Sequence, residues 1–203
     1  MSSSRSRRDI QAAETRQLIL RSALKLFTSQ GYGATSVSDI AAAAGVAVPT
    51  IYTSVGPKPE LLRRLLDLVD EQADIPQLVG QLRASDDPSE VLALQVRITR
   101  QLAERCGDIL TALASAAQVD PKMAETYAAG MQRSRDGARS TTERIEQLHG
   151  LSSDVTVEQA TALIATLTLP EVWTSLCGTF GWSFDAAEEW IVNTLRGQVL
   201  GTG

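Results

Sequence analysis

The segment VPTIYTSVGPK, residues 48–58, is rich in small, hydroxylated and flat side chains and has no charge before its final lysine. Thr50 and Tyr52 bring hydroxyls that can donate hydrogen bonds to phosphate oxygens. Val48 and Pro49 are small and apolar, so they can touch the methyl groups of thymine. This composition suits contact with bases and phosphates better than solvation.

The final residue of the segment, Lys58, lies where we expect the next helix to begin. A cation is unfavourable at a helix N-terminus, because the helix dipole is positive there. A phosphate bound at this point would satisfy the helix amides and the ammonium together. We therefore predict a phosphate contact for Lys58; the alternative is a free lysine on the surface.

Two very short helices are predicted to position these side chains. Ser36 and Asp39 have the spacing of a capping box, which starts a helix that ends at Gly45. A second helix begins near Pro49 and ends before Gly56, because proline suits a first helical turn and glycine interrupts a helix. Short helices contribute little stability by themselves, so we expect another reason for their presence.

Two short helices joined by a tight turn that contains glycine form a helix-turn-helix. The second helix of this motif can be short, since it presents only its first turn and one face to the major groove of DNA. Ile51 and Val55, one turn apart, are predicted to point toward the core. The alternative is an ordinary helix–loop–helix corner, and the spacing alone does not decide between the two.

The charge of the chain is distributed unevenly. The net charge is −5, but residues 1–64 contain nine Lys/Arg against four Asp/Glu, whereas residues 65–203 contain ten against twenty. A basic N-terminal third on an acidic protein indicates an anionic partner for that end only. A solvated charge pattern is the alternative that the charge by itself leaves open.

The rest of the chain has helical periodicity and no alternating strand pattern of convincing length, so we predict an all-α protein. The predicted division is a flexible basic arm (1–10), a helix-turn-helix domain (11–57) and a helical C-terminal domain (58–203). We expect further helices over residues 59–73, 88–105, 108–118, 121–148, 157–180 and 184–200.

The C-terminal part offers two apolar features. Met123, Tyr127 and Met131 recur on one helical face, and Trp173 follows on a later helix. Such a stripe is more often core than a ligand pocket, but as a pocket it would favour a flat or flexible apolar effector. The last two helices carry more large apolar side chains than one hairpin can bury, which predicts a two-fold four-helix interface. These side chains are Leu169, Trp173, Leu176, Phe180, Trp190 and Leu195.

Catalytic and metal-binding patterns are not evident. His149 is the only histidine, and Cys106 and Cys177 are expected to be reduced thiols, so we predict neither a metal site nor a cofactor nor an enzyme. We recognise no apolar run of membrane-spanning length and no signal peptide, and expect a cytoplasmic protein without a membrane partner. Two alternatives stay open: a helical binding protein whose basic end meets a protein or a membrane, and a small helical enzyme.

The N-terminal motifs resemble the DNA-binding domain of the TetR family of bacterial transcriptional regulators. The resemblance covers residues 11–68 without gaps and rests on the runs GYGATSVSDIA, AGV and PTIY, on Lys58 and on Leu61-Leu62. A looser resemblance to a common ending of the family lies in LPEVW, GWS and WI near the C-terminus. The chain departs from the family pattern at two places. The family often has an aromatic residue where this chain has Val55, and a basic or histidine residue near Thr53-Ser54.

The resemblance implies a homodimer that binds a palindromic operator on double-stranded DNA. It further implies a C-terminal ligand-binding and dimerisation domain, in which a small effector releases the DNA, and repression as the usual mode. It places Thr35 and Ser36 at the cap of the second helix, near a phosphate, and Thr50 and Tyr52 on the recognition helix. The predicted DNA contacts are therefore Thr35, Ser36, Val48, Pro49, Thr50, Tyr52, Thr53 and Lys58.

Overall fold

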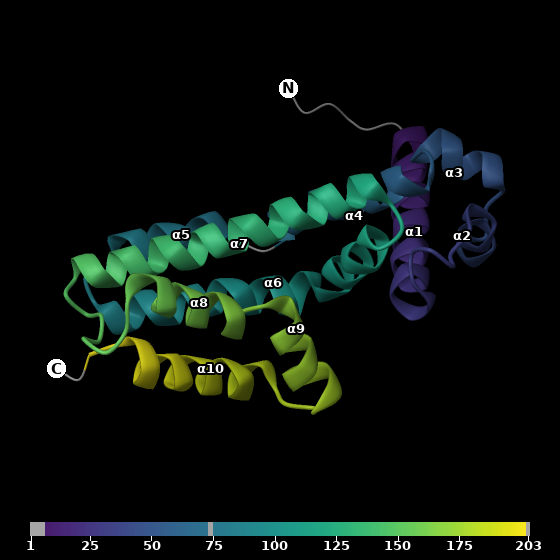
Figure 1. Cartoon of the computed structure of the whole chain (residues 1–203). Helices are drawn as coiled ribbons and strands as arrows, with labels where there is room; N and C mark the ends of the chain where they lie inside the picture. Colours follow the sequence, from purple (N-terminus) through teal and green to yellow (C-terminus); the bar gives the residue numbers. More distant parts are fainter. Residues whose placement is uncertain (1–6, 73–74, 202–203) are drawn as a thin grey trace, which may run out of the picture. The chain divides into compact units, whose positions relative to one another are not determined.

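The structure is a computed structural model that describes residues 7–72 and 75–201. Within these residues every regular element is a helix, which confirms the all-α prediction (Figure 1). The elements are α1 (Arg7–Gln30), α2 (Val37–Ala44), α3 (Val48–Ser54), α4 (Lys58–Gln72), α5 (Ile75–Ala84), α6 (Pro88–Ala117), α7 (Pro121–Gln147), α8 (Val157–Leu167), α9 (Pro170–Trp173), the π-helix η1 (Thr174–Thr179) and α10 (Phe184–Val199).

Three predictions about the helices were wrong. A single helix, α6, covers the two helices expected over 88–118, because Gly107 is tolerated inside a helix that packing supports. The helix expected over 157–180 is interrupted, since Pro170 lacks the amide hydrogen that would continue α8. The first helix begins earlier than predicted: α1 starts at Arg7, and the rest of the predicted arm, residues 1–6, lies outside the described residues.

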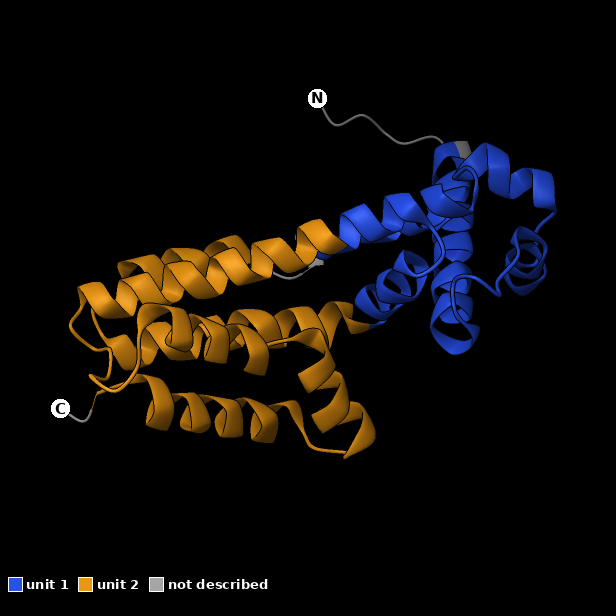
Figure 2. Ribbon diagram, in the orientation of Figure 1, with its two compact units in different colours: residues 1–69, 108–127 blue, residues 70–107, 128–203 orange. Residues whose placement is uncertain are grey.

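The chain forms two compact units, which Figure 2 shows in different colours. Unit 1 comprises residues 1–69 and 108–127, and unit 2 comprises residues 70–107 and 128–203. These limits differ from the predicted boundary at 57/58, because α4 and the adjoining ends of α6 and α7 contribute apolar side chains to the core of unit 1. The predicted division by function stays a prediction.

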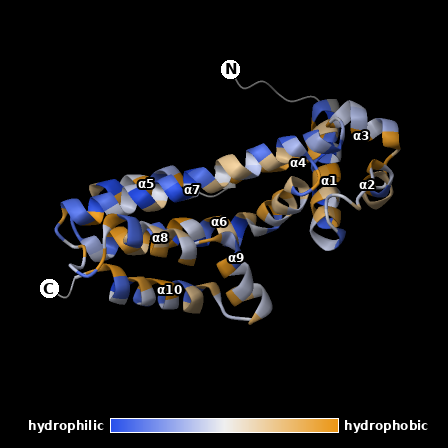
Figure 3. Ribbon diagram, in the orientation of Figure 1, coloured by the Kyte–Doolittle hydropathy of each residue, from blue (hydrophilic) through white to orange (hydrophobic). Residues whose placement is uncertain are grey.

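Unit 1 is built around the apolar ridge of α1. Ile19, Ala23 and Phe27 recur along one face of this helix and are fully buried. Ile40 of α2 and Ile51 of α3 are also fully buried in this core. The short helices α2 and α3 are therefore stabilised by packing on a long helix rather than by their own length. Figure 3 shows the apolar residues along α1.

Unit 2 has its own core and one buried charged residue. Trp173 is 1% exposed and stacks on Phe184 with the ring centroids 6.1 Å apart. The Glu188 carboxylate on α10 is almost fully buried and accepts hydrogen bonds from Arg97 and Arg100 of α6. Because the charge of Glu188 is paired, it ties α10 to α6 instead of destabilising the core.

Candidate nucleic-acid interface

Helix α2 begins with the capping box that the sequence predicts. The Asp39 amide donates to the Ser36 hydroxyl oxygen (3.1 Å), and the Ser36 amide donates to the Asp39 carboxylate (2.9 Å). The Ser36 hydroxyl also donates to this carboxylate, at 2.6 Å. Hydrogen bonds from the hydroxyl and the amide of Ser36 hold the pKa of Asp39 below its usual value. Ser36 thus has its hydroxyl hydrogen engaged inside the protein.

The turn between α2 and α3 is set by a glycine. Gly45 has φ of 64°, in the left-handed region that favours glycine, and the Val46 amide donates to the Ala41 carbonyl at 3.0 Å. The chain then enters α3 after Ala47, whose side chain offers no cap. Pro49 lies in the first turn, as predicted, where its missing amide hydrogen costs nothing.

Helix α3 turns one residue inward and leaves a face without ionised side chains exposed. Ile51 is its only buried residue, which agrees with the predicted inward direction. Tyr52 is 53% exposed, and Pro49 and Thr53 are also exposed. The Thr53 hydroxyl lies 3.1 Å from the Pro49 carbonyl oxygen, so its hydrogen is used within the helix. Val48 and Thr50 are half-buried.

The C-terminal end of α3 is held by a residue that sequence reasoning missed. The Arg16 guanidinium on α1 donates through Nε to the carbonyl oxygen of Ser54, at 3.1 Å. This bond satisfies a carbonyl that the end of the helix leaves without an intrahelical partner. The available signal was positional: Arg16 precedes the inward-facing residues Ile19 and Leu20 by about one helical turn.

Thr35 is placed differently from the prediction. Its side chain is only 1% exposed, and its hydroxyl donates to the Gly31 carbonyl at 2.9 Å. The hydroxyl therefore cannot reach a phosphate in this conformation. Thr35 instead helps to shape the turn that precedes α2.

Lys58 is half-buried and points toward that same turn. Its Nζ donates to the carbonyl oxygens of Tyr32 and Thr35, each at 2.9 Å. The ammonium also lies over the Tyr32 ring, 4.3 Å from the centroid. Burial, together with the nearby Asp120 carboxylate, raises the pKa of Tyr32 to about 12, so the ring stays neutral under the lysine. Lys58 is therefore not a free lysine on the surface, which was the alternative to the predicted phosphate contact.

The other cations near the start of α4 pair with carboxylates. Glu60 accepts from Arg63 at 2.6 Å and from Arg64 at 3.0 Å, and Arg63 also pairs with Asp67. Both arginines keep about half of their side chains exposed. Exposed pairs of this kind contribute little to stability, so they can open at little cost.

The four residues of the predicted ligand pocket fall in different units. Met123 is buried in the core of unit 1, and Tyr127 packs against that core. Met131 and Trp173 belong to unit 2, where Trp173 is part of the core. Packing in a core is the commoner role of such residues, and a shared ligand pocket stays a prediction.

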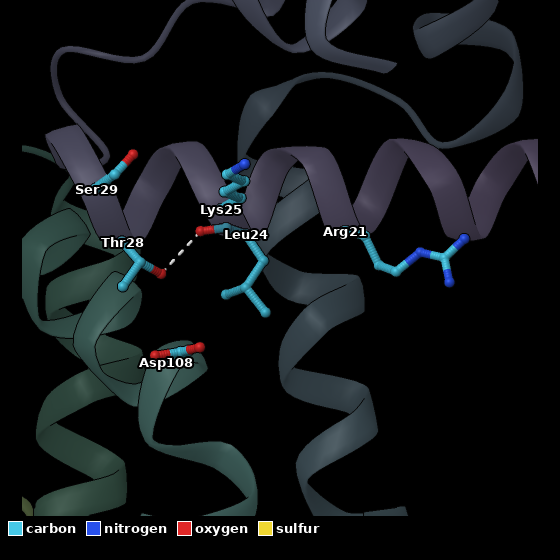
Figure 4. Close-up of a pocket in the computed structure, with 6 residues that line it drawn as sticks. All are labelled: Arg21, Leu24, Lys25, Thr28, Ser29 and Asp108. Atoms are coloured by element: carbon cyan, nitrogen blue, oxygen red, sulfur yellow. Dashed lines mark hydrogen bonds between the residues drawn. The ribbon is translucent and has the colours of Figure 1, made fainter. Parts of the chain in front are cut away.

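Two hollows on the described part of the surface were considered as ligand sites, and neither is lined by any of these four residues. One, of about 400 Å³, lies on unit 1 along α1 with Asp108 of α6 on its other side (Figure 4). It is lined by Arg21, Leu24, Lys25, Thr28, Ser29 and Asp108. The other, of about 440 Å³, lies along α5 in unit 2. Both hollows are open on the surface rather than enclosed.

The described part of the chain shows little sign of a metal site or a membrane-spanning helix. No group of three or more His, Cys, Asp or Glu residues there could hold a metal ion. No single described helix is long and apolar enough to cross a membrane. A bent pair, Val157–Leu167 with Pro170–Thr179, meets the criteria of length and composition only.

Sequence comparison finds matches to part of the chain. Residues 19–65 match a family model described as bacterial regulatory proteins of the tetR family. The HTH-type transcriptional regulator AcrR of Shigella flexneri is 39% identical over 82 residues, which are 40% of this chain and 38% of that protein. The aligned part thus spans well under half of this relative. These matches confirm the predicted resemblance to the TetR family.

Solved structures resemble the chain over nearly its whole length. NalD, the secondary repressor of the MexAB-OprM multidrug efflux pump in Pseudomonas aeruginosa, has a TM-score of 0.71 at 22% identity, covering 94% of this chain and 98% of NalD. SmeT in complex with triclosan has a TM-score of 0.70 at 17% identity, covering 94% of this chain and 93% of SmeT. At these identities the likeness establishes the fold, and it confirms the predicted fold class.

Proposed function

We propose that this chain, whose N-terminal segment is a TetR-family helix-turn-helix domain, is a transcriptional regulator that binds double-stranded DNA. It acts as a repressor on a palindromic operator and is released by a small-molecule effector. The observation that carries this proposal is the exposed face of α3, which has a buried anchor, a held C-terminal end and no ionised side chain. Such a face can enter a major groove without first losing a solvation shell around a charge.

The exposed and half-buried side chains of α3 are assigned to different parts of the DNA. Pro49 and Thr53 are exposed on the outer side of α3 and are assigned to base edges, where the methyl group of threonine can touch thymine. Tyr52 and Thr50 are assigned to phosphates, which fix the helix in the groove without reading sequence. Val48 is assigned to apolar contact at the rim of the groove. Ser36 is exposed near the start of α2 and is also assigned to a phosphate, to which its hydroxyl donates after turning away from the Asp39 carboxylate.

A homodimer gives the operator its two-fold symmetry, because each protomer then binds one half-site. Among the residues of the predicted interface, Trp173 and Leu195 are buried inside the protomer, whereas Phe180 and Trp190 are 69% and 42% exposed. Trp182, at 39% exposed, packs edge-on against Trp190 with the centroids 6.0 Å apart. Exposed aromatic groups of this size are typical of an interface.

The dimer is tested with Trp190→Glu, since a change at the buried Leu195 would unfold the protomer instead. We expect the variant to sediment as a monomer at micromolar concentration and to bind the operator much more weakly than the wild type. A wild type that is itself monomeric at that concentration would contradict the dimer.

The effector is assigned to unit 2 and is expected to be apolar or aromatic. Met131 and Trp173 belong to this unit, and the related fold of SmeT was solved with triclosan. This role needs no cofactor and no turnover, so the chain is assigned a regulatory rather than a catalytic activity. The proposed place of action is the cytoplasm, where the DNA is.

The proposal is tested by binding of the purified protein to duplex DNA at several salt concentrations. A DNA-binding regulator gives a steep negative slope of log affinity against log salt, because bound phosphates release counterions. A preferred sequence with two symmetric half-sites should emerge from a random duplex library. Salt-independent binding, or binding to a protein or an anionic membrane but not to DNA, would favour the alternative of a helical binding protein.

A further inference from the structure

We infer that Lys58 is a positioning residue that locks the turn between α1 and α2 to the start of α4. The inference rests on the proposed function, because what the turn positions is the helix-turn-helix. This role is separate from the phosphate contact that the sequence predicts for this lysine.

The ammonium of Lys58 is already engaged on the inside of unit 1. Two of its three N–H groups donate to the carbonyl oxygens of Tyr32 and Thr35, each at 2.9 Å. The positive charge also lies 4.3 Å from the centroid of the Tyr32 ring, within the range of a cation–π interaction. The third N–H group is not used in these two bonds, so the role of Lys58 in the turn does not depend on a phosphate contact.

The turn that Lys58 holds determines where α2 begins. Residues 31–36 join α1 to α2, and Thr35 immediately precedes the N-cap residue Ser36. The Thr35 side chain is buried and its hydroxyl is bound to the Gly31 carbonyl, so the turn has one compact conformation. Lys58 is itself the first residue of α4. A single side chain thus connects the entries of two helices that flank α3.

The opposite side of the turn is held by α6. The Tyr32 amide donates to the Ser115 hydroxyl oxygen at 3.2 Å. Gly31 has φ of 88°, and a β-carbon there would lie only 3.3 Å from the same oxygen. The Tyr32 ring packs on Phe27 with the centroids 5.1 Å apart. These contacts hold Tyr32 through its amide and its ring. Lys58 adds hydrogen bonds to the carbonyl oxygens of Tyr32 and Thr35.

The test compares Lys58→Met, which removes the ammonium but keeps most of the stem, with Lys25→Met on α1. Lys25 is exposed and belongs to the same unit, so this control corrects for the loss of one positive charge. For Lys58→Met we expect a roughly tenfold or greater loss of operator affinity and faster amide hydrogen exchange over residues 31–36 in the free protein. A salt slope reduced by about 0.9, with exchange and stability as in the wild type, would overturn the inference.

Lys58→Arg separates the two roles in a variant that keeps the charge. A guanidinium binds phosphate at least as well as an ammonium does, so a phosphate contact predicts unchanged or tighter binding. The planar fork cannot place two donors on these carbonyls with its charge over the ring in the same way. We therefore expect weaker operator binding at an unchanged salt slope, and affinity at or above the wild-type value would overturn the inference.

The exchange measurement also keeps this inference separate from the proposed function. If the wild type binds no duplex DNA, the proposed function fails, and with it the link between Lys58 and DNA. Faster exchange over residues 31–36 in Lys58→Met would still support the contacts of Lys58 with the turn. Unchanged exchange would refute them.

Discussion

Helices α2 and α3 have eight and seven residues, yet their ends and faces are built differently. Helix α2 has a complete capping box at Ser36, a glycine C-cap at Gly45 and three buried residues. Helix α3 has no side-chain cap and only one buried residue, Ile51. Its C-terminal end depends on Arg16, which comes from another helix.

The difference indicates a division of labour inside unit 1. Helix α2 uses its side chains on its own ends and on the core, so it forms a stable support. Helix α3 buries one side chain in the core, and its other side chains stay available to a partner. A surface helix with so few stabilising features of its own is explained most directly by the partner that its free face meets.

The largest expected effect is at the single anchor of α3. Ile51→Ala should lower the free energy of unfolding by about 2–4 kcal/mol, since a fully buried side chain is truncated. Ile40→Ala in α2 is the matched control, because Ile40 is also fully buried. Urea unfolding measures both. At conditions where both variants are folded, Ile51→Ala should bind DNA more weakly than Ile40→Ala; equal affinities would contradict the division of labour.

The next effect concerns reading of sequence by α3. Thr53→Ala removes the methyl group that is assigned to thymine, so it should change the selected duplex sequence and cost roughly 1–3 kcal/mol of binding free energy on the original operator. Because Thr53 is exposed, the unfolding free energy should change little. Selection from a random duplex library with wild type and variant is the measurement. An unaltered selected sequence would place the base contacts elsewhere.

A smaller effect is expected at the cap of α2. Ser36→Ala removes the hydroxyl that accepts from the Asp39 amide and should cost about 1 kcal/mol of stability. Urea unfolding measures the cost, and Ser38→Ala, an exposed serine within α2, is the control. The sequence preference should not change. If stability is unaffected, the capping box is not the support that distinguishes α2 from α3.

The smallest effect is a pH dependence of the same cap. The folded-state pKa of Asp39 lies below 3.8, so its contribution to stability is present above that pH and is lost as the pH falls through the lowered pKa. Asp39→Asn should therefore lose less stability than the wild type between pH 6 and pH 3. Urea unfolding at both values tests this, and identical losses would refute the carboxylate's role.

Local features of unit 1 were predictable from sequence, because the interacting residues are neighbours in the chain. The capping box of Ser36 and Asp39, the glycine at 45 and the proline at 49 all act within one turn. The contacts of Lys58 and Arg16 were not predicted, since they join residues 23 to 38 positions apart. Only the folded chain decides whether such a cation faces a carbonyl or the solvent.

The same limit explains the errors in unit 2. The apolar surplus of the last helices was visible in the sequence, but which members face inward depends on packing. Trp173 and Leu195 are buried within the protomer, whereas Phe180 and Trp190 are exposed. The buried Glu188 could not be recognised either, because its partners Arg97 and Arg100 lie about ninety residues earlier.

The exposed face of α3 is proposed to read the DNA sequence, and Tyr52→Glu tests this most directly. Tyr52 is 53% exposed, so a carboxylate there should leave the fold and its stability intact while repelling phosphates. The measurement is equilibrium binding to the duplex that the wild type selects, at low and physiological salt. If the exposed face of α3 reads DNA, the wild type binds tightly and in a salt-dependent way, and the folded variant shows no sequence-specific binding. Equal binding by the two proteins would contradict it.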